Sequence, residues 1–192
     1  MPNQQPTISD ASGRRLFACS VVGLLAFIID EDERILLLAH PRRNGEWEVV
    51  NGALEAAETI VEGILREVRE EAGPDVKVRP LGTVHAFTFY YDDHVQYLLS
   101  LCYLLAYQGG QVQPGDDMRG SQFRWWSLPE LEDEQVKIIV PRDQKWLMRR
   151  AIELYRLWKD QTVDLQPDRD PAARSKYHLD ASSPPPNPRR RA

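Results

Sequence analysis

Apolar residues occur in runs of strand length through the first part of the chain, and short polar segments separate these runs. Leu16 to Ile29 is one such run, Asp30 to Glu33 is wholly acidic, and Arg34 to Ala39 is again mainly apolar. Two runs of this kind on either side of a polar turn predict paired strands. The segment therefore predicts a β-hairpin.

Later apolar runs predict additional strands, because they are rich in β-branched and aromatic residues. The predicted strands are Trp47 to Val50, Val76 to His85, Ala86 to Tyr91, Val95 to Tyr107 and Phe123 to Ser127. A helical turn is expected directly after the last of them, at Leu128 to Leu131. Most of the predicted strand material therefore lies in the part of the chain before residue 131.

Two longer segments have the spacing of amphipathic helices. In residues 60–72, apolar positions three and four apart form one face. Thr59 and Glu62 form a capping box before this helix, and Gly73 ends it. Residues 143–158 carry a broad apolar stripe that is typical of core packing, so we assign no cofactor to this second helix.

The first helix carries Glu67, Glu70 and Glu71, which lie within about 100° of one another around the helix axis. One interpretation is a solvated face, in which Arg66 and Arg69 pair with these acids. The other is a metal site, since such a patch repels itself unless cations occupy it. The helix alone leaves both interpretations open.

The wider segment from Gly52 to Gly73 has the pattern G-x5-E-x7-R-E-aliphatic-x-E-E-x-G, which resembles the Nudix box. A chance match at these positions in a chain of this length is expected on the order of once in a million or less. The resemblance implies a catalytic loop, helix and loop that opens at Gly52. It also implies that Glu58 ends the first loop and that Arg66 orients the acidic cluster.

By the same resemblance, Glu70 and Glu71 bind metal directly, and Glu67 is a ligand or organises the attacking water. The main-chain carbonyl of Asn51 is a ligand in some relatives. Carboxylates are hard oxygen ligands that suit Mg²⁺, with Mn²⁺ as a substitute. Asn51 and Pro74 depart from the family pattern, which has Gly and an aliphatic residue there, and we expect neither departure to change the function.

Five further residues are candidates for the substrate or metal site. Arg42 and Arg43 lie in a loop where relatives often place phosphate-contacting side chains, and a merely solvated loop is the alternative. Tyr90 and Tyr91 are candidates for stacking on a base, although aromatic residues in strands often pack across strands instead. The Gly-rich loop at 109–120 holds Asp116 and Asp117, and relatives often supply an additional metal ligand or base from this loop; of the two we take Asp117 as the candidate metal ligand.

The length and composition of the chain predict one globular domain. It has 192 residues, of which 42% are hydrophobic, enough for one sizeable core. The resemblance implies an α/β/α sandwich with a mixed β-sheet, the catalytic loop-helix-loop and a C-terminal helix. We expect this domain at residues 16–160, after a flexible N-terminus at 1–15 and before a flexible, Pro- and Arg-rich tail at 161–192.

Charge and cysteine content exclude several classes of protein. The net charge is −5, and the tail is basic, so the remainder is acidic and a nonspecific nucleic-acid binder is not expected. Cys19 and Cys102 are too few and too isolated for a zinc or disulfide scaffold. No segment resembles a signal peptide or a membrane span, so we expect a cytoplasmic protein without a membrane partner.

The sequence thus predicts a metal-dependent hydrolase that cleaves the pyrophosphate bond of a nucleoside diphosphate linked to another group. Nucleoside triphosphates, ADP-ribose and dinucleoside polyphosphates are the candidate substrates. Two alternatives are a noncatalytic nucleotide-binding sensor and an interaction protein that acts through the Pro/Arg-rich tail. The expected partner is a small nucleotide derivative, and the formation of a homodimer stays open.

Overall fold

The structure is a computed structural model that describes residues 6–42, 46–133, 136–142 and 144–161. The described residues form two compact units, one at Pro6–Cys19 and a larger one that begins at Ser20. Arg43 and the predicted tail after Gln161 lie outside the described residues. No helix of the described part is both long and apolar enough to cross a membrane.

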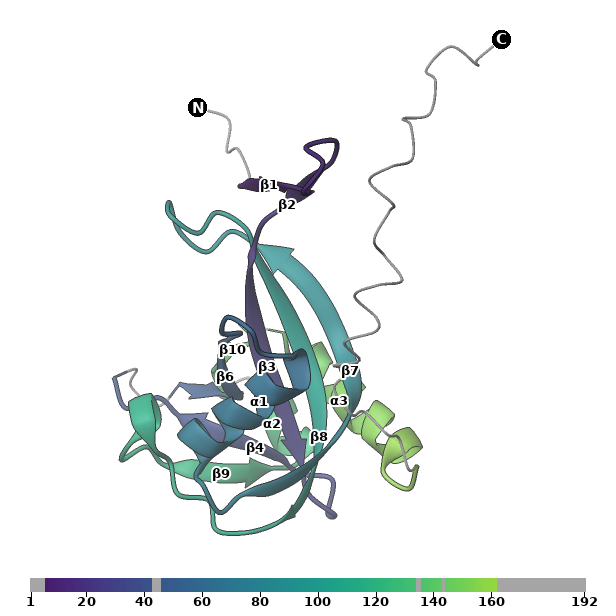
Figure 1. Cartoon of the computed structure of the whole chain (residues 1–192). Helices are drawn as coiled ribbons and strands as arrows, with labels where there is room; N and C mark the ends of the chain where they lie inside the picture. The colour runs from purple at the N-terminus through teal and green to yellow at the C-terminus, as the bar shows by residue number, and fades with distance from the viewer. Residues whose placement is uncertain (1–5, 43–45, 134–135, 143, 162–192) are drawn as a thin grey trace. The chain divides into compact units, whose positions relative to one another are not determined.

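The larger unit is built on a mixed sheet, which has eight strands within the described residues (Figure 1). The strands are β3 (Val21–Ile29), β4 (Ile35–Ala39), β5 (Trp47–Glu48), β6 (Val50–Ala53), β7 (Lys77–Phe89), β8 (Leu98–Gly109), β9 (Phe123–Trp126) and β10 (Ile138–Val140). The main order is β10-β5-β4-β3-β8-β7, while β6 pairs with β3 and β9 pairs with β4. The β3–β8 and β5–β10 pairs are parallel, and the remaining pairs are antiparallel.

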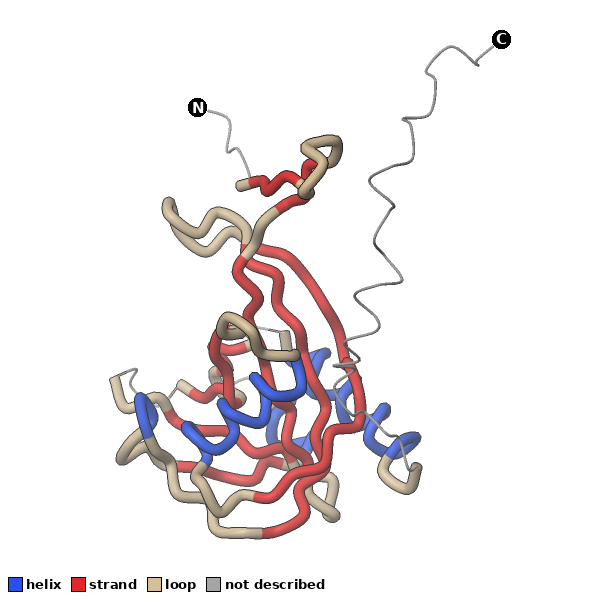
Figure 2. The backbone as a smooth tube through the Cα atoms, viewed as in Figure 1, coloured by secondary structure: helices blue, strands red, loops and turns tan. Residues whose placement is uncertain are grey.

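Helices cover both faces of this sheet (Figure 2). On one face lie α1 (Ile60–Glu67) and the π-helical turn η1 (Val68–Ala72), and on the other lies α3 (Lys145–Trp158). The short α2 (Leu128–Glu132) follows β9. The predicted α/β/α sandwich with a C-terminal helix is therefore confirmed.

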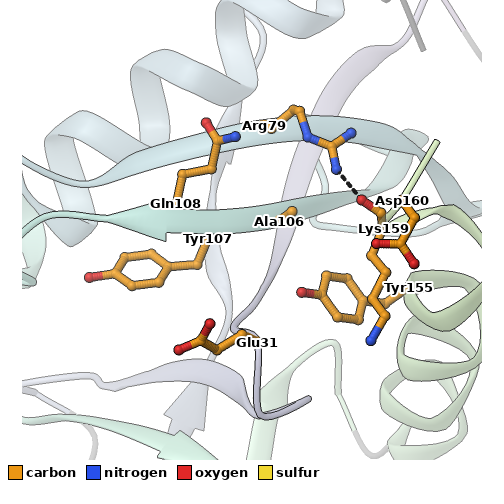
Figure 3. A pocket seen from close by; sticks show the side chains of 8 residues that line it. All are labelled: Glu31, Arg79, Ala106, Tyr107, Gln108, Tyr155, Lys159 and Asp160. Atoms are coloured by element: carbon orange, nitrogen blue, oxygen red, sulfur yellow. Dashed lines mark hydrogen bonds between the residues drawn. The ribbon is translucent and has the colours of Figure 1, made fainter. Parts of the chain in front are cut away.

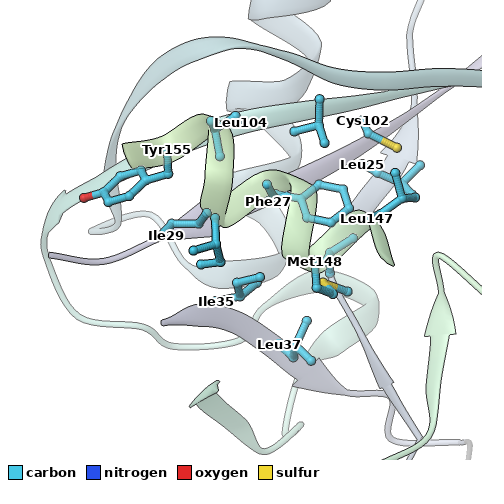
Figure 4. Packing of buried hydrophobic residues seen from close by; sticks show 14 of the residues in the cluster. Leu25, Phe27, Ile29, Ile35, Leu37, Cys102, Leu104, Leu147, Met148 and Tyr155 are labelled. Carbon is cyan, nitrogen blue, oxygen red and sulfur yellow. The ribbon is translucent and has the colours of Figure 1, made fainter. Parts of the chain in front are cut away.

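Strand β3 shows why its sequence is apolar at nearly every position. Leu25, Phe27 and Ile29 point into the core beneath α3, which Figure 4 shows in part. Leu24, Ala26 and Ile28, at the alternate positions, point into the core beneath α1. Because side chains alternate between the faces of a strand, a strand covered on both sides has no polar face.

The N-terminal part of the chain differs from the prediction. The single strand predicted at Leu16 to Ile29 is wrong, because β2 (Leu16–Ala18) pairs with β1 (Thr7–Ser9) in a separate small hairpin. Leu16 and Phe17 are exposed, so they do not extend the buried strand β3. A run of apolar residues does not reveal which strand each part of the run pairs with. The turn at Asp30 to Glu33 and the pairing of β3 with β4 confirm the predicted hairpin, with its first strand shortened to Val21–Ile29.

The other predicted elements are confirmed with changed boundaries. The two strands predicted between Val76 and Tyr91 form one long strand, β7, with irregular register at Pro80/Gly82 and Thr83/His85. Strand β10 was not predicted, because a three-residue strand has too short a pattern. The box helix is α-helical only to Glu67 and continues as a π-helical turn, whereas a uniform α-helix was expected.

Candidate active site

Gly52 lies where a strand passes very close to the box helix. It is in β6, opposite Leu24 of β3. A Cβ atom added to Gly52 would lie 2.1 Å from Oε1 of Glu67. Only a residue without a side chain allows this approach, which explains why glycine stands at the first position of the box.

Arg66 joins the loop and the helix of the box. Its Nε donates to Oε1 of Glu58 at 2.8 Å, and its Nη2 donates to the carbonyl oxygen of Ala53 at 2.8 Å. Its Nη1 donates to Glu67 at 2.7 Å and to Glu70 at 3.0 Å. Arg66 lowers the pKa of Glu58, and Glu58 in turn is the main cause of the raised pKa of Arg66. Arg66 thus contacts the loop acid Glu58 and two acids of the helix, Glu67 and Glu70.

Glu71 is a buried carboxylate with only 9% of its surface exposed. Its Oε2 accepts a hydrogen bond of 2.8 Å from the backbone N–H of Asn51. Burial raises its pKa to about 8, and the nearby charges of Glu48, Glu67 and Asp117 act in the same direction. The Asn51 hydrogen bond opposes this shift. Burial also raises the pKa of Glu67.

The two directly adjacent acids of the box, Glu70 and Glu71, both lie in the π-helical turn η1 and differ in exposure. Glu71 is buried, whereas the side chain of Glu70 is 43% exposed. A π-helical turn is wider than an α-helical turn, and such turns frequently occur at functional sites. The three glutamates thus do not form the single solvated face that one interpretation of the sequence predicted.

The Gly-rich loop at residues 109–120 packs against the C-terminal end of the box. The backbone N–H of Gln113 donates to the carbonyl of Ala72 at 2.8 Å, and that of Gly115 donates to the carbonyl of Glu71 at 3.2 Å. The short 3₁₀ helix η2 (Asp116–Met118) follows. The negative charge of Asp117 contributes to the raised pKa of Glu71, so the structure brings this predicted residue near the box.

The described candidate substrate residues, Arg42, Tyr90 and Tyr91, lie outside this network. Arg42 is exposed in the loop after β4, and its backbone N–H donates to Nδ1 of His40 at 3.1 Å. Tyr90 and Tyr91 are exposed beyond the end of β7. The Tyr90 hydroxyl bonds to Asp93, within its own loop. The ring centroid of Tyr91 lies 6.3 Å from that of Phe89.

The sequence interpretation missed Glu48, a buried acid on β5. It lies three residues before Asn51, and its charge is the largest of the acidic contributions to the raised pKa of Glu71. The position of Glu48 between Trp47 and Val49 is typical of an ordinary strand residue. A lone acid in an apolar strand is the only signal by which the sequence marks it.

The donor atoms of the site are carboxylate oxygens, which fit a divalent cation. Among the described residues, no three His, Cys, Asp or Glu side chains converge as a metal-binding set. Arg66 forms ion pairs with Glu67 at 2.7 Å and with Glu70 at 3.0 Å. Carboxylates are nevertheless hard oxygen donors that suit a divalent cation, and a bound cation would favour their anionic form.

A cavity of about 290 Å³ lies at the end of β8 and α3, and no residue of the box lines it (Figure 3). Arg79, in its wall, donates hydrogen bonds to the main-chain carbonyls of Lys159 and Gln161. These bonds fasten the end of α3 to β7. We assign this cavity no part in the candidate active site.

Comparison with known proteins decides the family. A family model of the NUDIX domain matches residues 20–150. The chain belongs to the Nudix family. The resemblance of Gly52 to Gly73 to the Nudix box is thereby confirmed, and the matched segment lies within the larger of the two compact units.

Two curated relatives of this Nudix domain have names that state an activity. The NAD-capped RNA hydrolase NudC of Vibrio parahaemolyticus is 33% identical over 119 residues, which cover 61% of this chain and 41% of NudC. The ADP-ribose pyrophosphatase of Methanocaldococcus jannaschii is 31% identical over 115 residues, which cover 58% of this chain and 67% of the relative. The chain thus matches less than half of the Vibrio protein.

A solved structure supports the fold. The crystal structure of an ADP-ribose pyrophosphatase from Streptococcus suis matches with a TM-score of 0.57 and 20% sequence identity. The match covers 72% of this chain and 93% of that chain. At this level of identity, the likeness concerns the sandwich fold alone.

Proposed function

We propose that this Nudix domain is a metal-dependent hydrolase that cleaves the pyrophosphate bond of a nucleoside diphosphate linked to another group. The observation that carries the proposal is the intact acidic set of the box, with Glu67 and Glu70 held by Arg66 and Glu71 held by Asn51. A noncatalytic sensor would not need all of these acids. Their retention favours an enzyme over a binding domain.

Nudix hydrolases generally use divalent metal ions, and we propose Mg²⁺ for this one, with Mn²⁺ as a substitute. Glu67, Glu70, Glu71 and the main-chain carbonyl of Asn51 would hold the metal, with Asp117 as an additional ligand. A bound divalent cation neutralises diphosphate charge and lowers the pKa of a bound water. The Asn51 N–H fixes the orientation of Glu71, while Arg66 restrains Glu67 and Glu70.

The substrate is proposed as a class. Arg42 and Arg43 would contact phosphate, and Tyr90 and Tyr91 would stack on a base. Of the predicted candidates, ADP-ribose also occurs in the name of a relative, and the name of another relative adds the NAD cap of RNA to the candidate substrates. All contain a pyrophosphate bond. Because residues 1–160 carry a net negative charge, we expect the substrate to be a free nucleotide derivative rather than RNA. A cytoplasmic location stays a prediction.

The proposal is tested by incubating the full chain with each of these compounds and either Mg²⁺ or Mn²⁺. Phosphate release after a coupled phosphatase is the measurement. With an active compound, Glu70→Gln and Glu71→Gln should each reduce kcat/KM by roughly 10²-fold or more, because they remove electrostatic support for the transition state.

The matched control is Glu153→Gln, which changes an exposed acid of α3. It should keep the wild-type rate. Folded Glu70→Gln and Glu71→Gln variants with wild-type rates would refute the roles of these acids. Binding of a compound without turnover across the whole panel would instead support a sensor.

A further inference from the structure

Strand β7 forms one edge of the sheet (Figure 1). It is the last strand in the main order and pairs with β8, and no strand of the described part of the chain lies along its other side. The outer N–H and C=O groups of an edge strand can pair with another chain, so proteins usually protect such edges. With 13 residues, β7 makes this edge long.

The first half of β7, residues 77–84, has several protective features. Pro80 lacks a backbone N–H, and the register with β8 shifts twice between Pro80 and His85. Nε of Arg150 in α3 donates to the carbonyl oxygen of Val84 at 2.8 Å, so this acceptor is already occupied. This half of the strand is therefore a poor template for another strand.

The second half of β7, residues 85–89, is regular and uncharged. Its pairing with β8 runs without a shift from His85 to Phe89. It contains neither proline nor glycine, nor any Asp, Glu, Lys or Arg. Ala86 and Thr88 are exposed. This half therefore lacks the devices that protect the first half, and it can accept another strand.

Aromatic side chains extend along one face of this second half. The ring centroids of His85 and Phe87 lie 6.0 Å apart, and those of Phe87 and Phe89 lie 5.9 Å apart. The row continues to Tyr91, and Trp146 of α3 packs edge-on against His85 at 5.1 Å. Phe89, Tyr91 and Trp146 are 38%, 61% and 48% exposed. Exposed aromatic side chains beside an open edge are typical of an interaction surface.

The charges along β7 favour an antiparallel arrangement with a second copy of the chain. The strand begins with Lys77 and Arg79, and the loop that follows it contains Asp92 and Asp93. Two antiparallel copies place the basic start of each strand toward the acidic loop of the other. A parallel arrangement would instead bring like charges together. The edge is therefore complementary to itself.

We propose that two copies of this chain pair through residues 85–89 of β7, antiparallel and with Phe87 on the twofold axis. Phe87 is the middle residue of the regular, uncharged half. Ala86 of each copy then lies opposite Thr88 of the other, and the two aromatic rows join on one face of a continuous sheet. A twofold interface uses the same patch on both copies. The inference does not depend on the proposed hydrolase activity.

Sedimentation velocity of the full chain over a range of concentrations tests the dimer. The double variant Ala86→Lys/Thr88→Lys places two positive charges opposite each other at both contacts between these positions. The dissociation constant of the dimer should therefore rise by roughly 10-fold or more. Both positions are exposed in the single chain, so the variant should fold, which circular dichroism checks.

The double variant Ala86→Lys/Thr88→Glu tests the register of the pair. It changes the same two positions, but opposite charges now face each other at both contacts, so it should dimerise at least as tightly as the wild type. The matched control is Leu157→Lys, which places a charge at an apolar residue of α3 that is 65% exposed. It should dimerise like the wild type.

The other outcomes would overturn the inference. A wild-type chain that stays monomeric up to about 100 μM does not form the dimer. Equal dissociation constants for the wild type and Ala86→Lys/Thr88→Lys would mean that another surface forms the contact. Loss of the dimer in both double variants would contradict the pairing about Phe87. If Ala86→Lys/Thr88→Lys does not fold, Ala86→Glu/Thr88→Glu makes the same comparison with negative charges.

Discussion

At the scale of the residue, Gly52 shows how a missing side chain positions a carboxylate. The backbone of β6 passes so close to Glu67 that a methyl group at Gly52 would overlap its carboxylate. Gly73 has a different reason, because its φ of 120° lies in a region that side chains disfavour. The two glycines that bound the box are therefore required by separate physical constraints.

Gly52→Ala should displace the Glu67 carboxylate. A displacement of about 1 Å at a catalytic group reduces rates by roughly 10²-fold, so kcat/KM on an active compound should fall by about that factor. Overpacking should also lower the free energy of unfolding by about 1–3 kcal/mol, measured in urea.

A second variant separates the clash from other effects of the same substitution. In a Glu67→Ala background, the added methyl group meets no carboxylate, so Gly52→Ala should cost much less stability there. An equal cost in both backgrounds would mean that the contact with Glu67 is not the cause.

At the scale of the element, the box helix begins and ends by different means. Thr59 and Glu62 form the predicted capping box, with the Thr59 N–H donating to Oε2 of Glu62 at 2.8 Å. The end is π-helical and is held by the loop that contains Gln113 and Gly115. The N-terminal end of the helix is therefore fixed by residues next to it in sequence, whereas the C-terminal end is fixed by a segment that is distant in sequence.

Thr59→Ala should lower the free energy of unfolding by about 1 kcal/mol, because it removes the side-chain acceptor for the Glu62 N–H. Thr59→Ser keeps the hydroxyl and should stay close to the wild type. Urea unfolding followed by circular dichroism measures both variants. Equal losses in the two variants would argue against a capping role.

At the scale of the whole domain, an ion pair connects α3 to the β3–β4 turn. Arg156 Nε donates to Oε2 of Glu33 at 2.8 Å. This hydrogen bond is the main cause of the lowered pKa of Glu33. A carboxyl group whose pKa is lower in the folded state stabilises the fold above its unfolded pKa, and the stabilisation disappears as the pH falls through the folded pKa.

Glu33→Gln should therefore lower the urea midpoint slightly at pH 7, and the difference from the wild type should vanish once the pH falls below the lowered pKa of Glu33. Arg156→Gln should show the same pH dependence. The double variant should cost less than the sum of the single variants, because the two residues are partners. A difference that persists in acid would exclude this ion pair as its source.

Several features of the domain follow from the sequence alone. The capping box at Thr59, the order of the box acids and the apolar alternation of β3 depend on neighbouring residues, so a single chain displays them. The family follows from the same segment, because its spacing is specific. The proposed reaction can be stated before any coordinates are known.

The tertiary structure decided what depends on distant segments. The separation of β2 from β3 and the positions of Asp117 and Glu48 near Glu71 result from strand register and from packing between elements. A one-residue change in register reverses the face on which a side chain lies, and no local pattern fixes that register. The sequence by itself thus determined the box and its proposed chemistry, whereas the fold determined which other acids stand beside it.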